Sequence, residues 1–307
     1  MVFPFSSASD RTRKRYSKLA GPMRIVGEQR HVDIDGYPLA FWEAGRGGRA
    51  IVFLHGNSAC KEIFAAQMVA AAERGYRAIA IDLPGHGDSA DSASPQKDYE
   101  LTRTGTLVLR LLMQLGLERP LVVGWSLGGH LALEMLGRAW PLRGVAIAGT
   151  PPCGPGADEM LQAFKPSDAM ALTGAPEFGP SELETYLGAL YGRAETIPPA
   201  FRAAAARTDG VLREVMFTQF AVPDRGCHAH TVIAGSATPI CVVHGSEECF
   251  FDRAYLAELQ WRALWQDRIF DIEGAGHCPF FERPQACNDI LFDFAAAVFG
   301  PEPGPGQ

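Results

Sequence analysis

Residues 121–129 read Leu-Val-Val-Gly-Trp-Ser-Leu-Gly-Gly, and this stretch decides the fold. Its first three residues form an apolar run typical of a buried strand, and an apolar helical pattern follows over residues 127–140. Ser126 therefore stands at a strand-to-helix turn inside a Gly-x-Ser-x-Gly sequence. Such a turn strains the serine backbone, exposes its hydroxyl above the sheet, and needs the two glycines because a Cβ atom there would clash. The stretch predicts a nucleophilic Ser126.

Outward from this turn, short apolar runs alternate with helical patterns, which indicates a mostly parallel sheet with helices on both faces. The N-terminal pair of strands, 31–35 and 38–44, differs and predicts an antiparallel hairpin. The other expected strands are 50–54, 77–81, 121–123, 144–148, 240–243 and 268–271. The expected helices are 61–74, 100–117, 127–140, 181–190, 210–220 and 285–299.

Beyond Thr150 the pattern changes to Pro- and Gly-rich segments with short amphipathic helices, until strands resume near residue 240. We expect one α/β core, built from residues 31–150 and 237–300, that is interrupted by an inserted helical cap over 151–236. Residues 1–30 are an N-terminal extension that carries a basic cluster, and residues 301–307 are a flexible tail. The cluster comprises Arg11, Arg13, Lys14, Arg15 and Lys18, and we interpret it as a solvated arm.

Composition excludes several classes of function. The chain has 307 residues and a net charge of −7, which argues against a nucleic-acid partner. No apolar run exceeds the six residues 294–299, well short of the roughly 20 that cross a bilayer. The N-terminus lacks the order of an export signal, and the 7 cysteines show no paired spacing, so we expect a cytoplasmic protein with free thiols. The oligomeric state stays open between monomer and dimer.

A serine nucleophile needs a base, and His277 is the candidate because it follows the last strand on a glycine-rich loop. An acid that orients this histidine should follow the strand 240–243, where Glu247, Glu248 and Asp252 are all present. Glu248 stands three residues after Gly245, and we favour this position for the acid. We expect Glu247 to point elsewhere and Asp252 to cap the next helix.

The oxyanion of an attacked carbonyl needs backbone donors, and we expect the N–H groups of Leu127 and Asn57 to supply them. Asn57 follows the strand 50–54 in the sequence His-Gly-Asn-Ser. The loop 82–89 follows another strand, and we interpret it as structural support beside the site. His228 and His230 lack the further ligands of a zinc site, so we expect neither a metal nor a cofactor.

These motifs resemble the α/β-hydrolase superfamily over nearly all of residues 31–299. Within it the chain is most similar to the α/β-hydrolase type of N-acyl-homoserine lactone lactonase, which quenches quorum sensing. The matching segments are residues 54–58, 82–87, 124–130, 149–152 and 206–210. The last two lie at the start of and within the expected cap, which is where substrate class is set.

The resemblance implies the α/β-hydrolase fold with Glu248 as the acid, in a Gly-x-x-Glu-x-Phe setting that residues 245–250 match. It also implies that Tyr186, together with Asn57, contacts the substrate. Two departures stand out: Cys249 replaces a family proline, and the N-terminal extension is additional.

The resulting hypothesis is that Ser126, activated by His277 and Glu248, opens the ring of a small acyl lactone without a metal. His277 directing water straight onto the lactone is an alternative to the acyl-enzyme route. A general carboxylesterase on small acyl esters is the alternative function, and a receptor-like α/β-hydrolase that binds a lactone with low turnover is another. Residue types alone do not give the preferred acyl-chain length.

Overall fold

The computed structural model describes residues 27–192, 196–223 and 225–300, and its centre is an eight-stranded sheet. The strand order is β1-β2-β4-β3-β5-β6-β7-β8, with β1 and β2 antiparallel to their neighbours and every other pair parallel. The expected mixed α/β architecture is therefore confirmed. The basic cluster and the C-terminal tail lie outside the described residues.

The strands are β1 (Glu28–Ile34), β2 (Tyr37–Ala44), β3 (Ala50–Leu54), β4 (Arg77–Ile81), β5 (Leu121–Trp125), β6 (Gly144–Ala148), β7 (Ile240–Gly245) and β8 (Leu264–Ile272). The helices before the insertion are η1 (Lys61–Phe64), α2 (Ala65–Glu73), α3 (Pro95–Asp98), α4 (Leu101–Gln114) and α5 (Leu127–Gly137). The helices of segment 151–236 are α6 (Ala157–Ala163), α7 (Asp168–Leu172), α8 (Pro180–Tyr191), α9 (Pro199–Arg207), α10 (Gly210–Phe220) and α11 (Ala229–Gly235). The last three are α12 (Arg253–Glu258), α13 (Pro279–Glu282) and α14 (Pro284–Phe299).

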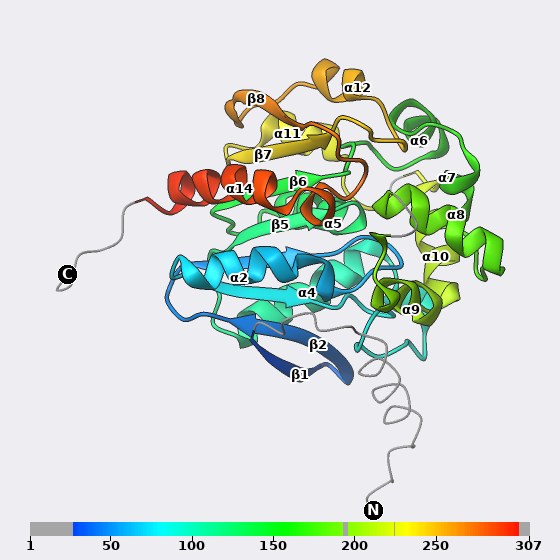
Figure 1. The fold of residues 1–307 in the computed structure, drawn as a ribbon, viewed down its shortest axis with the longest axis horizontal. Helices are drawn as coiled ribbons and strands as arrows, with labels where there is room; N and C mark the ends of the chain where they lie inside the picture. The colour runs from blue at the N-terminus through cyan, green and yellow to red at the C-terminus, as the bar shows by residue number, and fades with distance from the viewer. Residues whose placement is uncertain (1–26, 193–195, 224, 301–307) are drawn as a thin grey trace, which may run out of the picture.

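The four central strands β3, β5, β6 and β7 are buried along their whole length, which explains their continuous apolar sequence. Helices α2 and α14 pack together on one face of the sheet, while α4, α5 and α11 pack together on the other (Figure 1). Side chains from both layers complete the core. Leu107, Leu111 and Leu112 of α4 are fully buried, and Leu115 just after it is partly buried.

Several boundaries differ from the sequence prediction by a few residues, and two of these differences have identifiable reasons. Strand β8 begins at Leu264, earlier than the expected residue 268. Gln266 and Asp267 have φ of 55° and 51° and form an irregularity in the strand, so its first half does not follow the sequence pattern of a regular strand. Helix α4 ends before the expected residue 117. Gly116 adopts φ 70°, and the N–H of Leu117 bonds the carbonyl of Leu112, which closes the helix with a Schellman motif.

Segment 151–236 connects β6 to β7, and these strands pair in parallel, so the sheet continues across the inserted residues. Helices α6 to α10 gather at one side of the molecule, whereas α11 packs on α5 beside the sheet (Figure 1). None of the helices in the described ranges combines the length and apolar character that a membrane crossing needs.

Candidate active site

Ser126 lies at the turn between β5 and α5 with φ 53° and ψ −118°, a left-handed backbone that non-glycine residues rarely adopt. Its N–H donates to the carbonyl of Ala148 at 2.9 Å, which ties the turn to the neighbouring strand. A Cβ atom on Gly124 would lie 2.3 Å from the carbonyl oxygen of Gly128, and one on Gly128 would lie 2.0 Å from that of Leu54. The glycines are needed for the close approach that the motif predicts.

His277 and Glu248 form a buried pair beside this turn. The imidazole Nδ1 lies 2.9 Å from Oε1 and 2.8 Å from Oε2 of Glu248, and the N–H of Phe250 donates to Oε1 at 2.9 Å. The indole Nε1 of Trp125 donates to the carbonyl of His277 at 2.7 Å, which anchors the histidine loop on β5. The carboxylate therefore fixes one orientation of the ring.

The charge state of Glu248 follows from these contacts. Burial raises the pKa of its carboxyl, but the neighbouring His277 and the hydrogen bonds from His277 and Phe250 outweigh burial. The pKa consequently lies below its ordinary value, and Glu248 is ionised at neutral pH. An ionised partner is what stabilises an imidazolium during proton transfer.

The two rival acids lie elsewhere. Glu247 is exposed, although its N–H bonds the carbonyl of Ala275. Asp252 occupies the first position before α12, yet its side chain makes no capping hydrogen bond and instead pairs with Lys165. The expected capping by Asp252 is therefore wrong in its side-chain detail. Among the three candidates only Glu248 contacts His277.

Ser126 and His277 both line a cavity of about 90 Å³, together with Asn57, Leu127 and Tyr186. The structure thus brings together every residue expected at the site. Glu248 does not line the cavity but contacts Nδ1 of His277. In the described ranges no hydrogen bond joins the Ser126 hydroxyl to His277. Such bonds in catalytic sites are often long before substrate binds, and a serine hydroxyl turns freely to make them.

Two backbone N–H groups at this cavity are free to hold an oxyanion. Leu127 is the first residue of α5, and Asn57 lies in the loop after β3. Neither N–H donates a hydrogen bond to any residue that the structure describes. Leu127 also gains the positive end of the α5 dipole, which favours negative charge.

Segment 151–236 reaches the Asn57 loop directly. The side-chain amide of Asn57 donates to the carbonyl of Thr173 at 2.8 Å, and the hydroxyl of Tyr186 donates to the carbonyl of Asn57 at 3.3 Å. The buried Arg213 donates to the hydroxyl of Ser58 at 3.3 Å. These contacts fix the loop from the side that faces α7, α8 and α10.

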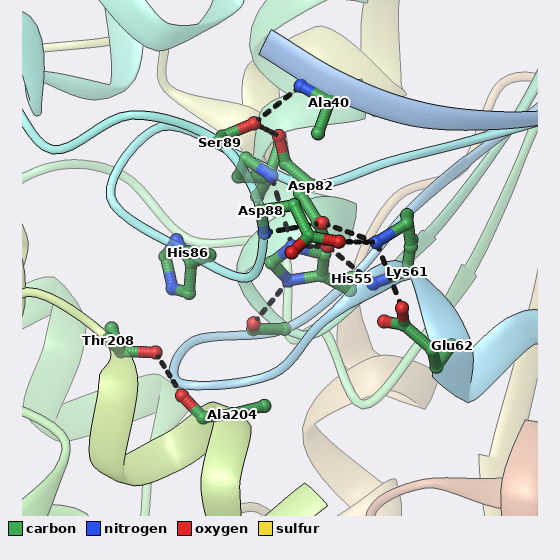
Figure 2. Close-up of polar contacts among 12 residues, drawn as sticks. Ala40, His55, Lys61, Glu62, Asp82, His86, Asp88, Ser89, Ala204 and Thr208 are labelled. Atoms are coloured by element: carbon green, nitrogen blue, oxygen red, sulfur yellow. Dashed lines mark hydrogen bonds and ion pairs between the residues drawn. The ribbon is translucent and has the colours of Figure 1, made fainter. Parts of the chain in front are cut away.

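A second set of contacts, around Lys61, stabilises the Asn57 loop. The ammonium of Lys61 is fully buried and lies 2.7 Å from a carboxylate oxygen of Asp82 and 2.8 Å from one of Asp88. Figure 2 draws these ion pairs as dashed lines. The N–H of Lys61 also donates to Asp82 at 2.8 Å. Burial lowers the pKa of Lys61, but the surrounding carboxylates raise it well above its ordinary value, so it stays charged. The 82–89 loop was expected to be structural, but the role of Lys61 was missed, because a lysine at the first position of the expected helix 61–74 reads as a solvated residue.

Two histidines complete this support. His55 accepts from the N–H of Leu83 at 3.0 Å, and His86 accepts from the N–H of Ser58 at 3.1 Å. Burial lowers the pKa of both imidazoles, His86 well below its usual value, which keeps each ring neutral and able to accept. Each histidine therefore connects the Asn57 loop to the 82–89 loop through a hydrogen bond.

Comparison with known proteins places this geometry among hydrolases. Residues 51–290 match the model of the alpha/beta hydrolase family. A solved structure of a mutant of the N-acyl homoserine lactonase AidH, complexed with N-hexanoyl homoserine lactone, is similar with a TM-score of 0.84 and 32% identity. That match covers 90% of this chain and 100% of the other.

More distant relatives share the architecture. The AB hydrolase superfamily protein YisY of Bacillus subtilis (strain 168) is 24% identical over 81% of this chain and 92% of its own. The esterase RhEst1 from Rhodococcus sp. ECU1013 has a TM-score of 0.71 at 23% identity, over 88% of this chain and 99% of its own, a likeness of fold alone.

Proposed function

The chain belongs to the alpha/beta hydrolase family, and from that premise we propose that it opens the ring of N-acyl-homoserine lactones through Ser126, His277 and Glu248, without a metal. The observation that carries the proposal is the meeting of three features at one cavity. These are the strained Ser126 turn, the buried His277–Glu248 pair and the free N–H groups of Asn57 and Leu127. The 32% identity to AidH supports the choice of lactone.

In the acylation step, the Ser126 Oγ attacks the lactone carbonyl carbon and passes its proton to Nε2 of His277. The N–H groups of Asn57 and Leu127 hold the oxyanion, while Glu248 stabilises the imidazolium through Nδ1. The bond between the carbonyl carbon and the ring oxygen then breaks, and His277 returns the proton to that oxygen. Because the leaving hydroxyl belongs to the same molecule, it stays tethered to the acyl-enzyme.

In the second step, His277 takes a proton from water, whose oxygen attacks the Ser126 ester and releases the N-acyl-homoserine carboxylic acid. The Ser126 oxygen recovers its proton from His277. One water molecule is consumed per ring opened. A route in which His277 directs water onto the lactone without the ester gives the same product.

The proposal extends to the surroundings of the site. Residues 151–236 would form the cap, since Thr173 and Tyr186 reach the Asn57 loop, and Tyr186 would contact the substrate.

All seven cysteines are free thiols, which supports a reducing cytoplasm. Acting on lactone signals there, the enzyme would quench quorum sensing.

A substrate panel tests the proposal. Purified protein is incubated with N-acyl-homoserine lactones of several chain lengths and with simple esters, each with and without EDTA. We expect ring-opened product that regenerates lactone on acidification, at a rate that EDTA does not change. Activity on simple esters alone would replace the proposal with a general carboxylesterase, and binding of lactone without turnover would indicate a receptor. Loss of activity in EDTA would overturn the serine mechanism.

A further inference from the structure

His130 is a buried polar side chain that the mechanism above does not use. It lies in α5 one helical turn after Ser126, and it lines the same cavity as Ser126 and His277. The backbone N–H of His130 donates to the carbonyl of Ser126 at 3.1 Å, which places the two residues one turn apart at the start of the helix. Only 7% of His130 is exposed, and its ring packs between Phe164 and Phe220, with centroids 6.0 and 5.1 Å away.

The imidazole of His130 has no hydrogen-bond partner among the residues that the structure describes. Two other polar side chains at the cavity, in contrast, have hydrogen-bond partners. The Asn57 amide is bonded to Thr173, and the Tyr186 hydroxyl is bonded to Asn57. Because the His130 ring lines the cavity, its nitrogens are available to a ligand, and the few polar groups in an apolar pocket usually fix the orientation of what binds there.

The charge state of the ring defines what it can bind. Burial, and then the nearby His277, lower the pKa of His130 to about 4. At neutral pH the ring is uncharged, so one nitrogen donates a hydrogen bond and the other accepts one. A ligand oxygen, as a carbonyl or a hydroxyl, matches this chemistry.

The position of His130 indicates which part of a ligand it meets. A second cavity of about 410 Å³ adjoins the first, and His130, Met216 and Phe220 line both. The inner cavity alone is smaller than the usual ligand pocket of about 300–1,000 Å³. Because His130 lines both cavities, its ring lies at the boundary between them, on the side toward which a group extending from Ser126 to the second cavity would point.

We propose that His130 is a specificity residue that hydrogen-bonds an oxygen substituent on the third carbon of the acyl chain, with Met216 and Phe220 as its apolar surroundings. This inference rests on the proposed lactonase function. The third acyl carbon is five bonds from the attacked lactone carbonyl carbon, about 6 Å in an extended chain. That span is comparable to the rise of one helical turn, about 5.4 Å, which separates Ser126 from His130 along the start of α5.

The test compares three lactones of equal length: N-hexanoyl, N-(3-oxohexanoyl) and N-(3-hydroxyhexanoyl) homoserine lactone. Each kcat/KM is divided by the rate of hydroxide-catalysed ring opening of the same compound. We expect the wild-type protein to prefer the two oxygen-bearing substrates by about 3- to 10-fold, the usual net effect of one neutral hydrogen bond. In His130→Leu we expect this ratio to fall to about one.

Two variants serve as controls. His130→Gln keeps a donor and an acceptor, so it should restore much of the preference. Phe164→Leu reshapes the wall beside the ring without changing its polarity, so it should alter the rates on all three lactones by the same factor. If His130→Leu does not fold, as judged by thermal unfolding, His130→Phe keeps a ring between Phe164 and Phe220 and replaces it.

Equal normalised rates on the three lactones by the wild-type protein would overturn this inference and leave the lactonase proposal intact. A preference that survives in both apolar variants would do the same. Absence of turnover on all three lactones would instead overturn the proposed function, and this inference with it.

Discussion

Ser126, the proposed nucleophile, is positioned by backbone geometry and not by a hydrogen bond to His277. Its positive φ places the residue on a sharp turn, and the N–H of the next residue, Leu127, remains free at the same cavity. The proposed nucleophile and one proposed oxyanion donor are thus fixed by a single turn. His277 and Glu248, from two other loops, complete the arrangement through contacts that are already formed without substrate.

The assignment of the acid predicts a contrast between two neighbouring carboxylates. Glu248→Ala should lower kcat by about 10³-fold or more, because the imidazole loses the partner that fixes its orientation. Asp252→Ala removes only an exposed ion pair with Lys165 and should leave kcat within about twofold. Steady-state kinetics of both variants, with folding checked by circular dichroism, decides between them. The opposite pattern would assign the role to Asp252.

The lowered pKa of Glu248 predicts a pH dependence of stability. Because the folded value lies below the unfolded one, near 4.3, the folded state binds fewer protons at this site. Ionised Glu248 thus stabilises the fold above the unfolded pKa, and the contribution is lost as pH falls through the folded pKa. The free energy of unfolding, measured with urea from about pH 6 to about pH 3, should converge between wild type and Glu248→Gln. A difference that stays constant over this range would contradict the assignment.

At the scale of elements, the loop that carries Asn57 is fixed on two sides. The Lys61–Asp82 cluster and the two histidines hold it against the 82–89 loop (Figure 2), and Thr173, Tyr186 and Arg213 hold it from segment 151–236. The loop is short, so each contact restrains the position of the Asn57 N–H. Its geometry therefore depends on residues that never touch a substrate.

The Lys61 cluster predicts a large effect from a buried charge. Lys61→Met leaves Asp82 and Asp88 without their cation and should lower the free energy of unfolding by about 3–5 kcal/mol. Arg253→Met is the matched control, since its pair with Asp271 is nearly half exposed and should cost at most about 1 kcal/mol. Urea unfolding measures both. Equal small losses would show that the cluster contributes little to the stability of the loop.

The strand-to-helix turn predicts a contrast between two glycines. Gly128→Ala would place a Cβ atom 2.0 Å from the carbonyl oxygen of Leu54, so we expect a loss of at least about 3 kcal/mol. Gly188→Ala in α8 meets no atom within 4 Å and should stabilise the protein by about 0.5–1 kcal/mol. A stable Gly128→Ala protein, by chemical denaturation, would contradict the described approach of α5 to β3.

Across the whole molecule, the features that the sequence predicted correctly are those that depend on local patterns of residues. The buried strands β3, β4 and β6 have the expected bounds, because apolar runs ended by polar or glycine residues mark them clearly. The proximity of Ser126, His277 and Glu248 was predictable because each follows a strand of the parallel sheet in the expected chain order. The approach of segment 151–236 to the Asn57 loop follows from chain topology, which local patterns do not encode.

Residues whose role depends on distant partners were missed for the same reason. Lys61 and Arg213 read as ordinary surface charges, and only their partners, 21 and 155 residues away, explain their burial. Cys249 gives the opposite case, since it is exposed although free cysteines are usually among the most buried residues. His130 was noted only as part of a motif, and its missing partner became visible once both cavities were known.

The most direct test of the account is the kcat/KM for N-hexanoyl homoserine lactone, measured for the wild-type protein and for Ser126→Ala prepared in parallel. Ring-opened product is quantified by mass spectrometry and by its return to lactone in acid. We expect turnover by the wild type and a loss of about 10⁴-fold or more in kcat/KM for Ser126→Ala. Turnover retained by Ser126→Ala, or none by a wild-type protein that hydrolyses simple esters, would contradict it.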